Sequence, residues 1–151
     1  MCLPRALRPC ETVESVFDVD YERLRQDGKR TILFDLDKTL RVRWAKDLFP
    51  GAERLLEDLR EAGFSIGIVT NRKRIRQDPL LRALSARVEV VRNARKPRRK
   101  AFLTLLETLG VQADEAVMIG DRRVTDVLGA NRAGIYSILV ANLEAARRSN
   151  R

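Results

Sequence analysis

Apolar residues occur along this chain in two alternating patterns. Short runs rich in β-branched residues, each leading into polar residues or glycine, lie within 32–40, 64–70, 88–91, 116–120 and 135–140. Runs of this length and composition are typical of strands buried on both faces of a sheet. Between them, apolar residues recur at the spacing of an amphipathic helix. The pattern therefore predicts five strands that alternate with helices.

Start and stop signals delimit the helices. Pro50 opens a helix and Gly63 closes it. Further helices are predicted from a basic stretch that reaches residue 84, from 97–109, and from a segment that ends near Gly134. Strands that alternate with helices indicate an α/β fold with an open parallel five-stranded sheet, flanked by helices, that binds ligands at the carboxyl ends of its strands.

The length of 151 residues suits one domain with a substantial core. Residues 1–30 mix proline, charged residues and short apolar stretches, which predicts an arm, with one short helix at 20–26, packed on the core. The core is expected to span 31–141, and 142–151 is expected to form a polar C-terminal tail.

Lysine and arginine outnumber aspartate and glutamate by 30 to 21, a formal net charge of +9. This balance favours anionic partners such as phosphorylated metabolites, nucleic acid or an anionic lipid surface. The chain has no histidine, which excludes triads and zinc sites that use it, and Cys2 and Cys10 are too few for a disulfide framework. No apolar run reaches the roughly 18 to 20 residues of a membrane span and no signal-peptide core is apparent, so we expect a cytoplasmic protein.

Asp35 and Asp37 occupy alternate positions where the first predicted strand ends. Both carboxylates therefore lie on one side of the strand, although paired anions repel and are costly to desolvate unless a cation relieves them. This arrangement indicates a divalent metal site. Asp35 is the candidate nucleophile that attacks phosphorus to form an aspartyl phosphate. Asp37 is the candidate acid that protonates the leaving oxygen and the base that later deprotonates water.

Two further groups of polar residues follow predicted strands. Thr70 and Asn71 end the second strand with a hydroxyl and an amide that suit a phosphoryl oxygen, although such residues commonly form turns. Lys96 lies in a basic segment between a strand and a helix, where it is placed to neutralise Asp35 and a phosphate. The alternative for this segment is a solvated charged face.

The motif GDRRVTD closes the fourth predicted strand. Gly120 and Asp121 end the strand, and Asp126 lies in the first turns of the next helix. Two roles are open at this stage: a second pair of carboxylates for the site, or a helix cap at Asp121 with Asp126 near the positive end of the helix dipole.

Four motifs occur in a fixed order: DxDxT after a strand, threonine at the end of the next strand, lysine before a helix, and GDxxxxD after a strand. This series resembles the four motifs of the haloacid dehalogenase superfamily of phosphotransferases. The resemblance covers residues 31–140. It implies a Rossmann-like core in which Asp35 is both nucleophile and Mg²⁺ ligand. It also implies that Asp121 is a Mg²⁺ ligand and that Asp126 supports the metal.

By the same resemblance, Thr70 and Lys96 form the phosphate clamp, and the backbone carbonyl of Asp37 completes the oxygen shell that magnesium prefers. The stretches 36–69 and 71–95 are too short to hold a cap domain. The resemblance therefore implies an open site, of the kind that suits large substrates, or small ones where neighbouring subunits close it.

A finer resemblance extends along nearly the whole chain. The arm, the segment RNARKP and the run GDRRVTDVLGANRAGIYSILV are similar to the YqeG family, class IIIA phosphatases related to the phosphatidylglycerophosphate phosphatases of mitochondria. Lys38 stands where many members carry asparagine, and residues 41–46 of the short flap at 41–47 are more basic than is usual.

The leading hypothesis is a Mg²⁺-dependent phosphomonoester hydrolase that acts on a lipid head group and converts phosphatidylglycerophosphate to phosphatidylglycerol. A soluble sugar phosphate, a nucleotide or a phosphoprotein is the alternative substrate. A basic nucleic-acid-binding protein is disfavoured because aromatic residues are few and no nucleic-acid motif occurs. An inactive member of the fold is expected to have lost a catalytic residue, and none is missing.

Two basic clusters are expected to flank the mouth of the site and to dock it against an anionic bilayer, peripherally at the inner face of the membrane. The first consists of Arg72, Lys73, Arg74 and Arg76. The second surrounds Lys96 within 92–100.

Overall fold

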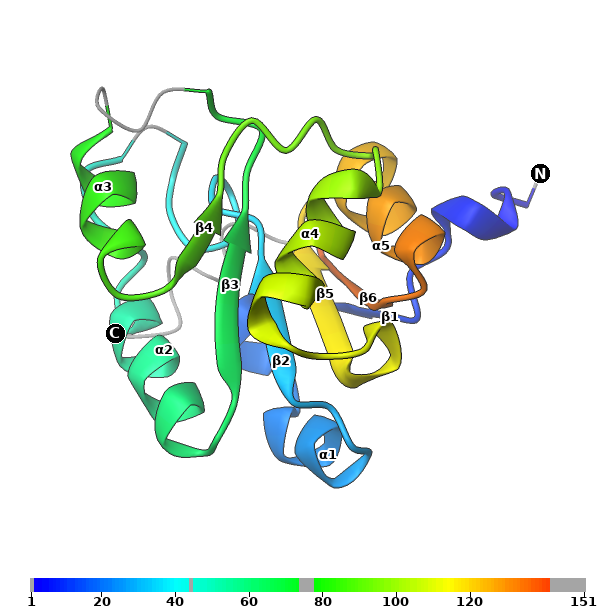
Figure 1. The fold of residues 1–151 in the computed structure, drawn as a ribbon, viewed down its shortest axis with the longest axis horizontal. Helices are drawn as coiled ribbons and strands as arrows, with labels where there is room; N and C mark the ends of the chain where they lie inside the picture. The colour runs from blue at the N-terminus through cyan, green and yellow to red at the C-terminus, as the bar shows by residue number, and fades with distance from the viewer. Residues whose placement is uncertain (1, 44, 74–77, 142–151) are drawn as a thin grey trace.

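Six parallel strands form a single sheet in the computed structural model, which describes residues 2–43, 45–73 and 78–141 (Figure 1). Their order across the sheet is β1-β6-β5-β2-β3-β4. The strands are β1 Glu11–Val13, β2 Thr31–Phe34, β3 Ser65–Val69, β4 Glu89–Val91, β5 Ala116–Gly120 and β6 Tyr136–Val140. The prediction of an open parallel α/β sheet is confirmed, with one strand more than the five expected.

The additional strand is β1, which comes from the N-terminal arm. Its three residues pair in parallel with β6, in the register Glu11 with Ile138 and Val13 with Val140. Only Val13 of the three is apolar, and β1 lies at the edge of the sheet with partly exposed side chains. Hydrophobic patterning could not reveal a strand this short, because edge strands need no continuous apolar run.

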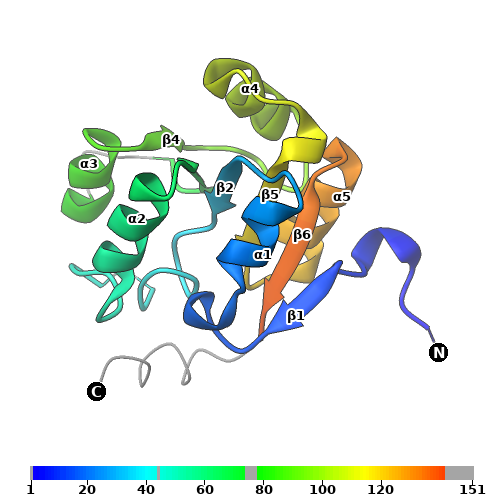
Figure 2. The same cartoon turned by 90° about the horizontal axis from the view of Figure 1, so that it is seen from below.

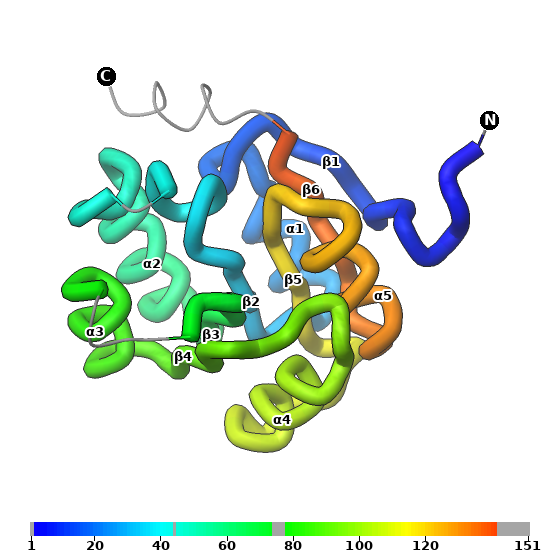
Figure 3. Tube along the Cα trace, turned by 90° about the horizontal axis from the view of Figure 1, so that it is seen from above, coloured from blue at the N-terminus to red at the C-terminus, as the bar shows by residue number. Residues whose placement is uncertain are grey.

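Helices cover both faces of the sheet (Figures 2 and 3). The helices α1 to α3 pack with one set of strand residues, and α4 and α5 pack with the other. Their bounds are α1 Tyr21–Gln26, α2 Ala52–Glu61, α3 Pro79–Ser85, α4 Lys100–Leu109 and α5 Leu128–Ala133. A π-helical turn, Arg123–Val127, precedes α5. The predicted tail, 142–151, lies outside the described residues.

Alternation along the buried strands supplies the two layers of the core. In β2, Ile32 and Phe34 belong to the cluster beneath α1, α2 and α3, whereas Leu33 packs with Phe102 and Leu105 of α4. All three β2 residues are fully buried. This two-sided burial explains why the central strands appear in the sequence as continuous apolar runs.

The connection between β4 and β5 determines where the site lies. From β2 the chain moves outward to β3 and β4, then returns through α4 to β5, which pairs with β2 on its other side. Strand order therefore reverses beside β2, and in open α/β sheets ligands bind at the carboxyl ends of strands at such a point.

Candidate active site

One cavity of about 250 Å³ opens at the carboxyl ends of the central strands. The residues proposed from the sequence line it from four separate segments: Asp35, Asp37, Thr70, Asn71, Lys96 and Asp121. Asp126 does not line the cavity but lies behind it, 1% exposed, in contact with Lys96. The structure thus brings together every site residue that the sequence singled out.

Three of the carboxylates form a compact cluster. Asp35, Asp121 and Asp126 each offer an oxygen, and these oxygens all lie within 4.8 Å of one another. Gly120 permits this approach, because a Cβ atom there would lie 2.4 Å from Cγ of Asp126. The backbone N–H of Arg122 donates to Asp126 at 3.2 Å and fixes its orientation.

The cluster is short of positive charge. Burial, followed by a hydrogen bond and charge repulsion from Asp35, raises the pKa of Asp121 to about 7. Burial and the charge of Asp35 likewise raise the pKa of Asp126 to about 6, although Lys96 opposes the shift. Hard oxygen ligands that repel one another in this way suit a hard divalent cation, which would hold all three ionised. The carboxylate of Asp37 is not part of the cluster, and its predicted contribution through the backbone carbonyl stays a prediction.

Lys96 contacts two of the three carboxylates in the cluster. Its Nζ donates to Asp35 at 2.9 Å and to Asp126 at 2.6 Å. Burial alone would lower the pKa of Lys96, but the two carboxylates outweigh burial and raise it. Lys96 is therefore a buried ammonium group fixed beside Asp35.

Asn71 has a contact that the sequence did not indicate. Its side-chain oxygen accepts from the backbone N–H of Lys96 at 2.8 Å, and its amide donates to the Lys96 carbonyl at 3.3 Å. Asn71 thus holds the loop that carries the lysine, and its predicted contact with phosphate stays a prediction. Thr70 is 2% exposed, and its hydroxyl accepts from the backbone N–H of Arg72 at 3.2 Å, which leaves its own proton available to an oxygen in the cavity.

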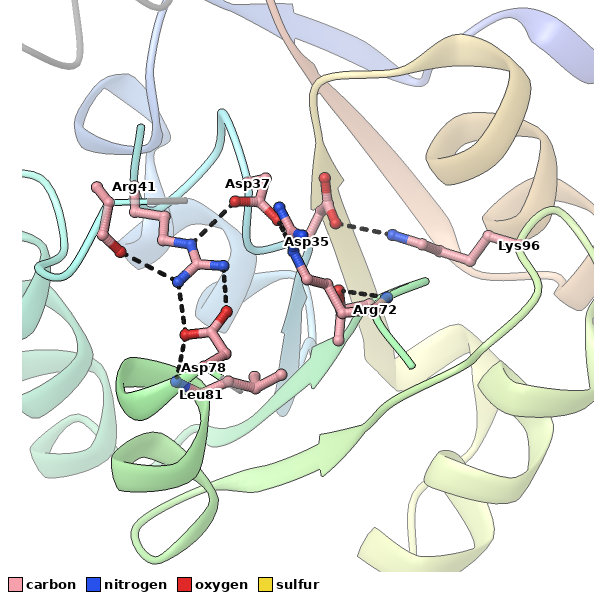
Figure 4. Close-up of polar contacts among 9 residues, drawn as sticks. Asp35, Asp37, Arg41, Arg72, Asp78, Leu81 and Lys96 are labelled. Carbon is pink, nitrogen blue, oxygen red and sulfur yellow. Dashed lines mark hydrogen bonds and ion pairs between the residues drawn. The ribbon is translucent and has the colours of Figure 1, made fainter. Parts of the chain in front are cut away.

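Asp37 lies in different surroundings from Asp35, although only one residue separates them (Figure 4). Arg41 Nε donates to one of its carboxylate oxygens at 2.9 Å, and Arg72 Nε donates to the other at 2.8 Å. The side chain of Asp37 remains 19% exposed, so it is accessible from the cavity that it lines. Two guanidinium groups therefore orient the candidate acid and base.

Arg41, which the sequence analysis placed in a short basic flap, makes contacts that the sequence did not predict. The structure buries its side chain to 1% exposure, with both terminal nitrogens on Asp78 at 2.9 and 2.5 Å. Asp78 also accepts from the backbone N–H of Leu81 and caps α3 (Figure 4). Burial would lower the pKa of Arg41, but its two carboxylate partners outweigh burial and raise it. The Asp78-Pro79 pair signals a helix start, but no sequence signal identifies Arg41 as its partner.

The basic clusters are divided between two cavities. Arg72 of the first cluster lines the active-site cavity, whereas Arg74 and Arg76 lie outside the described residues. Of the second cluster, Arg98, Arg99 and Lys100 line a separate cavity together with Arg132. The active-site cavity instead gains cations from nearby loops: Lys38, Arg43 and Arg122.

Comparison with known proteins agrees with this geometry. The sequence profile of the haloacid dehalogenase-like hydrolases matches residues 11–134, a range that contains every residue lining the cavity. The chain therefore belongs to this family of hydrolases. Probable phosphatase YqeG of Bacillus subtilis is 33% identical over 139 residues, which cover 91% of this chain and 79% of YqeG. The resemblance to the YqeG phosphatases is thereby confirmed.

Other relatives carry more specific names. Phosphatidylglycerophosphate phosphatase 1 of Arabidopsis thaliana is 26% identical over 145 residues, 91% of this chain but 42% of that protein. Glyceraldehyde 3-phosphate phosphatase of Methanopyrus kandleri is 36% identical over 103 residues, 61% of this chain and 42% of that protein. The chain thus spans less than half the length of either enzyme.

Solved structures show the same fold. A HAD phosphatase from Thermococcus onnurineus superposes with a TM-score of 0.56 at 30% identity, over 68% of this chain and 58% of the other. Among the described residues, no helix has the length and apolar character needed to cross a bilayer.

Proposed function

We propose that this chain hydrolyses phosphate monoesters with Mg²⁺ as cofactor and through an aspartyl phosphate on Asp35. One observation carries the proposal: the carboxylate of Asp35 lines the cavity, belongs to the acidic cluster and is held by Lys96. Asp35, Asp121 and Asp126 would hold the metal. When bound, Mg²⁺ supplies the charge that offsets repulsion between a phosphate dianion and Asp35.

In the first half of the reaction, Asp35 Oδ attacks phosphorus, and the bond from phosphorus to the leaving oxygen breaks. Asp37 donates a proton to that oxygen, so that an alcohol departs. Lys96 and the hydroxyl of Thr70 hold the phosphoryl oxygens in line with the attack.

In the second half, Asp37 accepts a proton from a water molecule as that water attacks phosphorus. The bond from phosphorus to Asp35 breaks, inorganic phosphate leaves, and both aspartates return to their starting forms. The positions of the two carboxylates support this division of labour. Asp35 lies in the acidic cluster, whereas Asp37 is oriented by two arginines and its side chain is 19% exposed.

Release of inorganic phosphate from an aryl phosphate, with and without Mg²⁺, tests the activity. Mass spectrometry after a rapid acid quench tests the intermediate, which is expected as a phosphorylated peptide that contains Asp35. Absence of Mg²⁺-dependent phosphate release would refute the proposed activity. Release without phosphorylation of that peptide would remove the covalent mechanism alone.

The substrate proposed is a lipid head group, with phosphatidylglycerophosphate as the leading case. The cationic lining of an uncapped cavity supports it, as does similarity to a phosphatidylglycerophosphate phosphatase along 91% of this chain. A soluble sugar phosphate is the second candidate, supported by similarity to the glyceraldehyde 3-phosphate phosphatases. Comparison of kcat/KM for phosphatidylglycerophosphate in mixed micelles with that for glyceraldehyde 3-phosphate, nucleotides and a phosphopeptide decides between them.

A lipid substrate also requires contact with the bilayer, which we place on the basic surface formed by Arg98, Arg99, Lys100 and Arg132. Each basic residue near an anionic surface contributes about 1 kcal/mol, so the contact is reversible and weakens with salt. Sedimentation with phosphatidylglycerol vesicles at low ionic strength is expected to show binding that Arg98→Ser/Arg99→Ser reduces. Absence of binding at low salt would refute the contact.

A further inference from the structure

Three cations at the active-site cavity have no task in the proposed reaction. Lys38, Arg43 and Arg122 line the same cavity as Asp35. The other two cations of that lining are engaged, Lys96 with Asp35 and Asp126, and Arg72 with Asp37. Within 2–43, 45–73 and 78–141, the side chains of Lys38, Arg43 and Arg122 make no hydrogen bond or ion pair.

The backbone of Lys38 strengthens the case that its side chain serves a ligand. Its φ is 64°, in the left-handed region that lysine rarely adopts, and its N–H donates to the Arg41 carbonyl at 2.7 Å. Asparagine or glycine adopts this conformation more readily. Strained backbone held by its surroundings is characteristic of functional sites. Here it places a cation, exposed and with no partner among the described residues, one residue after Asp37 on the lining of the cavity.

The distribution of charge indicates what these cations bind. The phosphate that is transferred must lie at Asp35, within reach of Lys96 and of the metal expected at the acidic cluster. Lys38 and Arg43 follow β2, and Arg122 follows the neighbouring strand β5, so three exposed cations converge on one cavity from adjacent loops. Exposed cations that have no partner in the described part of the chain suit a second group of negative charge.

We propose that Lys38, Arg43 and Arg122 form a subsite for a second anionic group of the substrate, a phosphodiester, phosphate or carboxylate close to the phosphomonoester that is cleaved. This inference rests on the proposed function and narrows it: the preferred substrates carry two anionic groups. A lipid head group with a phosphodiester and a soluble bisphosphate or phosphorylated acid share this chemistry.

The test uses soluble substrates, so that membrane contact plays no part. Glycerol 3-phosphate carries no second anion, deacylated phosphatidylglycerophosphate adds a phosphodiester, and 3-phosphoglycerate adds a carboxylate. The readout is the ratio of kcat/KM for each doubly anionic substrate to that for glycerol 3-phosphate, at physiological ionic strength. The variant is Lys38→Asn/Arg43→Ser/Arg122→Ser. The control is Arg98→Ser/Arg99→Ser/Lys100→Ser, which removes the same charge from the separate basic cavity.

The wild-type ratio is expected to exceed one, and the subsite variant is expected to lower it about tenfold, since exposed ion pairs are individually weak. The control variant should keep the wild-type ratio. An unchanged ratio in the subsite variant, or an equal fall in the control, would overturn the subsite. A higher ratio for the phosphodiester than for the carboxylate would assign the subsite to a lipid-type head group, and the reverse to a phosphorylated acid.

Failure of the subsite can be separated from failure of the proposed function. Titration calorimetry with the Asp35→Asn protein and Mg²⁺ measures the same ratio as Kd values without turnover. Equal kcat/KM values for all of these substrates would refute the subsite but leave the phosphatase activity standing. Selective binding without hydrolysis by the wild-type protein would keep the subsite and remove the phosphatase assignment.

The single variant Lys38→Asn provides an independent check. Its melting temperature is expected to equal or exceed that of the wild type, because asparagine relieves the left-handed backbone. The substrate ratio is expected to fall two- to fivefold, by about the contribution of one exposed cation. A lower melting temperature with an unchanged ratio would show that Lys38 serves the fold and would overturn its place in the subsite.

Discussion

Removal of the Arg41 guanidinium is the sharpest test of how this site is held together. Arg41 is the link between Asp37 in the cavity and Asp78 at the start of α3. Arg41→Met keeps an unbranched apolar side chain of similar length and removes only the charged fork. It leaves Asp78 with its capping bond to Leu81 but without its hydrogen-bonded cation.

The expected loss follows from burial. The side chains of Arg41 and Asp78 are only 1% and 5% exposed, so neither charge can be hydrated once its partner is gone. Breaking such a buried pair from one side costs about 3 to 5 kcal/mol. The free energy of unfolding at pH 7 should fall by that amount, which lowers the melting temperature by roughly 6 to 20 °C for a domain of this size.

The pH dependence of the contribution that Asp78 makes to stability should also change sign in the variant. In the wild type, burial would raise the pKa of Asp78, but Arg41 and the capping N–H outweigh burial and lower it. The folded state therefore binds this proton less readily than the unfolded state, and the contribution of Asp78 is lost as the pH falls below about 4. Without Arg41, burial dominates and raises the pKa of Asp78, so the deficit of the variant should shrink between pH 7 and pH 5.

Urea unfolding followed by circular dichroism at pH 7 and pH 5 measures both effects. The double variant Arg41→Met/Asp78→Asn is the matched control, because the amide oxygen keeps the helix cap while the buried charge disappears. It should recover about 2 kcal/mol relative to Arg41→Met. If the double variant lost as much unfolding free energy as the two single variants together, the coupling would be refuted. A stability deficit of Arg41→Met that stays constant with pH would refute it as well.

Three further predictions concern the acidic cluster. Asp35→Asn keeps the shape of the side chain but removes the proposed nucleophile, so turnover of an aryl phosphate should fall below about a tenth of the wild-type value, and a greater residual activity would contradict the assignment. Gly120→Ala places a Cβ atom 2.4 Å from Cγ of Asp126 and should abolish stabilisation by Mg²⁺, whereas Gly67→Ala in β3, which meets only the ends of leucine side chains, should keep it. In the metal-free protein the pKa values of Asp121 and Asp126, about 7 and 6, exceed the ordinary value, so stability declines as the pH rises from about 4 to 7. Mg²⁺ should therefore raise the melting temperature more at pH 8 than at pH 5.5, and an equal or smaller rise at pH 8 would count against the cluster as the metal site.

The extent to which the sequence predicted this fold depends on how each element is buried. The strands β2, β3, β5 and β6 are largely buried, and their apolar runs locate them to within a few residues. By contrast, β1 is a three-residue edge strand stabilised by pairing with β6, and no local pattern reveals it. The predicted start of one helix was also wrong. The helix expected from Pro97 begins at Lys100 in α4, because a turn precedes it.

The site residues were predictable because parallel strands bring their carboxyl ends to one edge of the sheet. Asp35, Thr70 and Asp121 each follow such an end, so their meeting is a consequence of topology. The contacts of Arg41 with Asp78 and of Asn71 with the backbone of Lys96 were not predictable. Each joins two loops whose separation depends on how helices and turns pack, and charged residues in loops carry no periodic signal.

The two aspartates of the DxD motif have opposite electrostatic surroundings, as the two different roles proposed for them require. Asp35 lies among carboxylates that share a single lysine, an arrangement that calls for a cation. Asp37 lies between two guanidinium groups, one of them buried and tied to α3, an arrangement that needs no metal. Groups whose environments differ in this way take different roles in catalysis. Because separate networks hold them, withdrawal of the metal should disturb Asp35 and its acidic neighbours while Asp37 keeps its orientation.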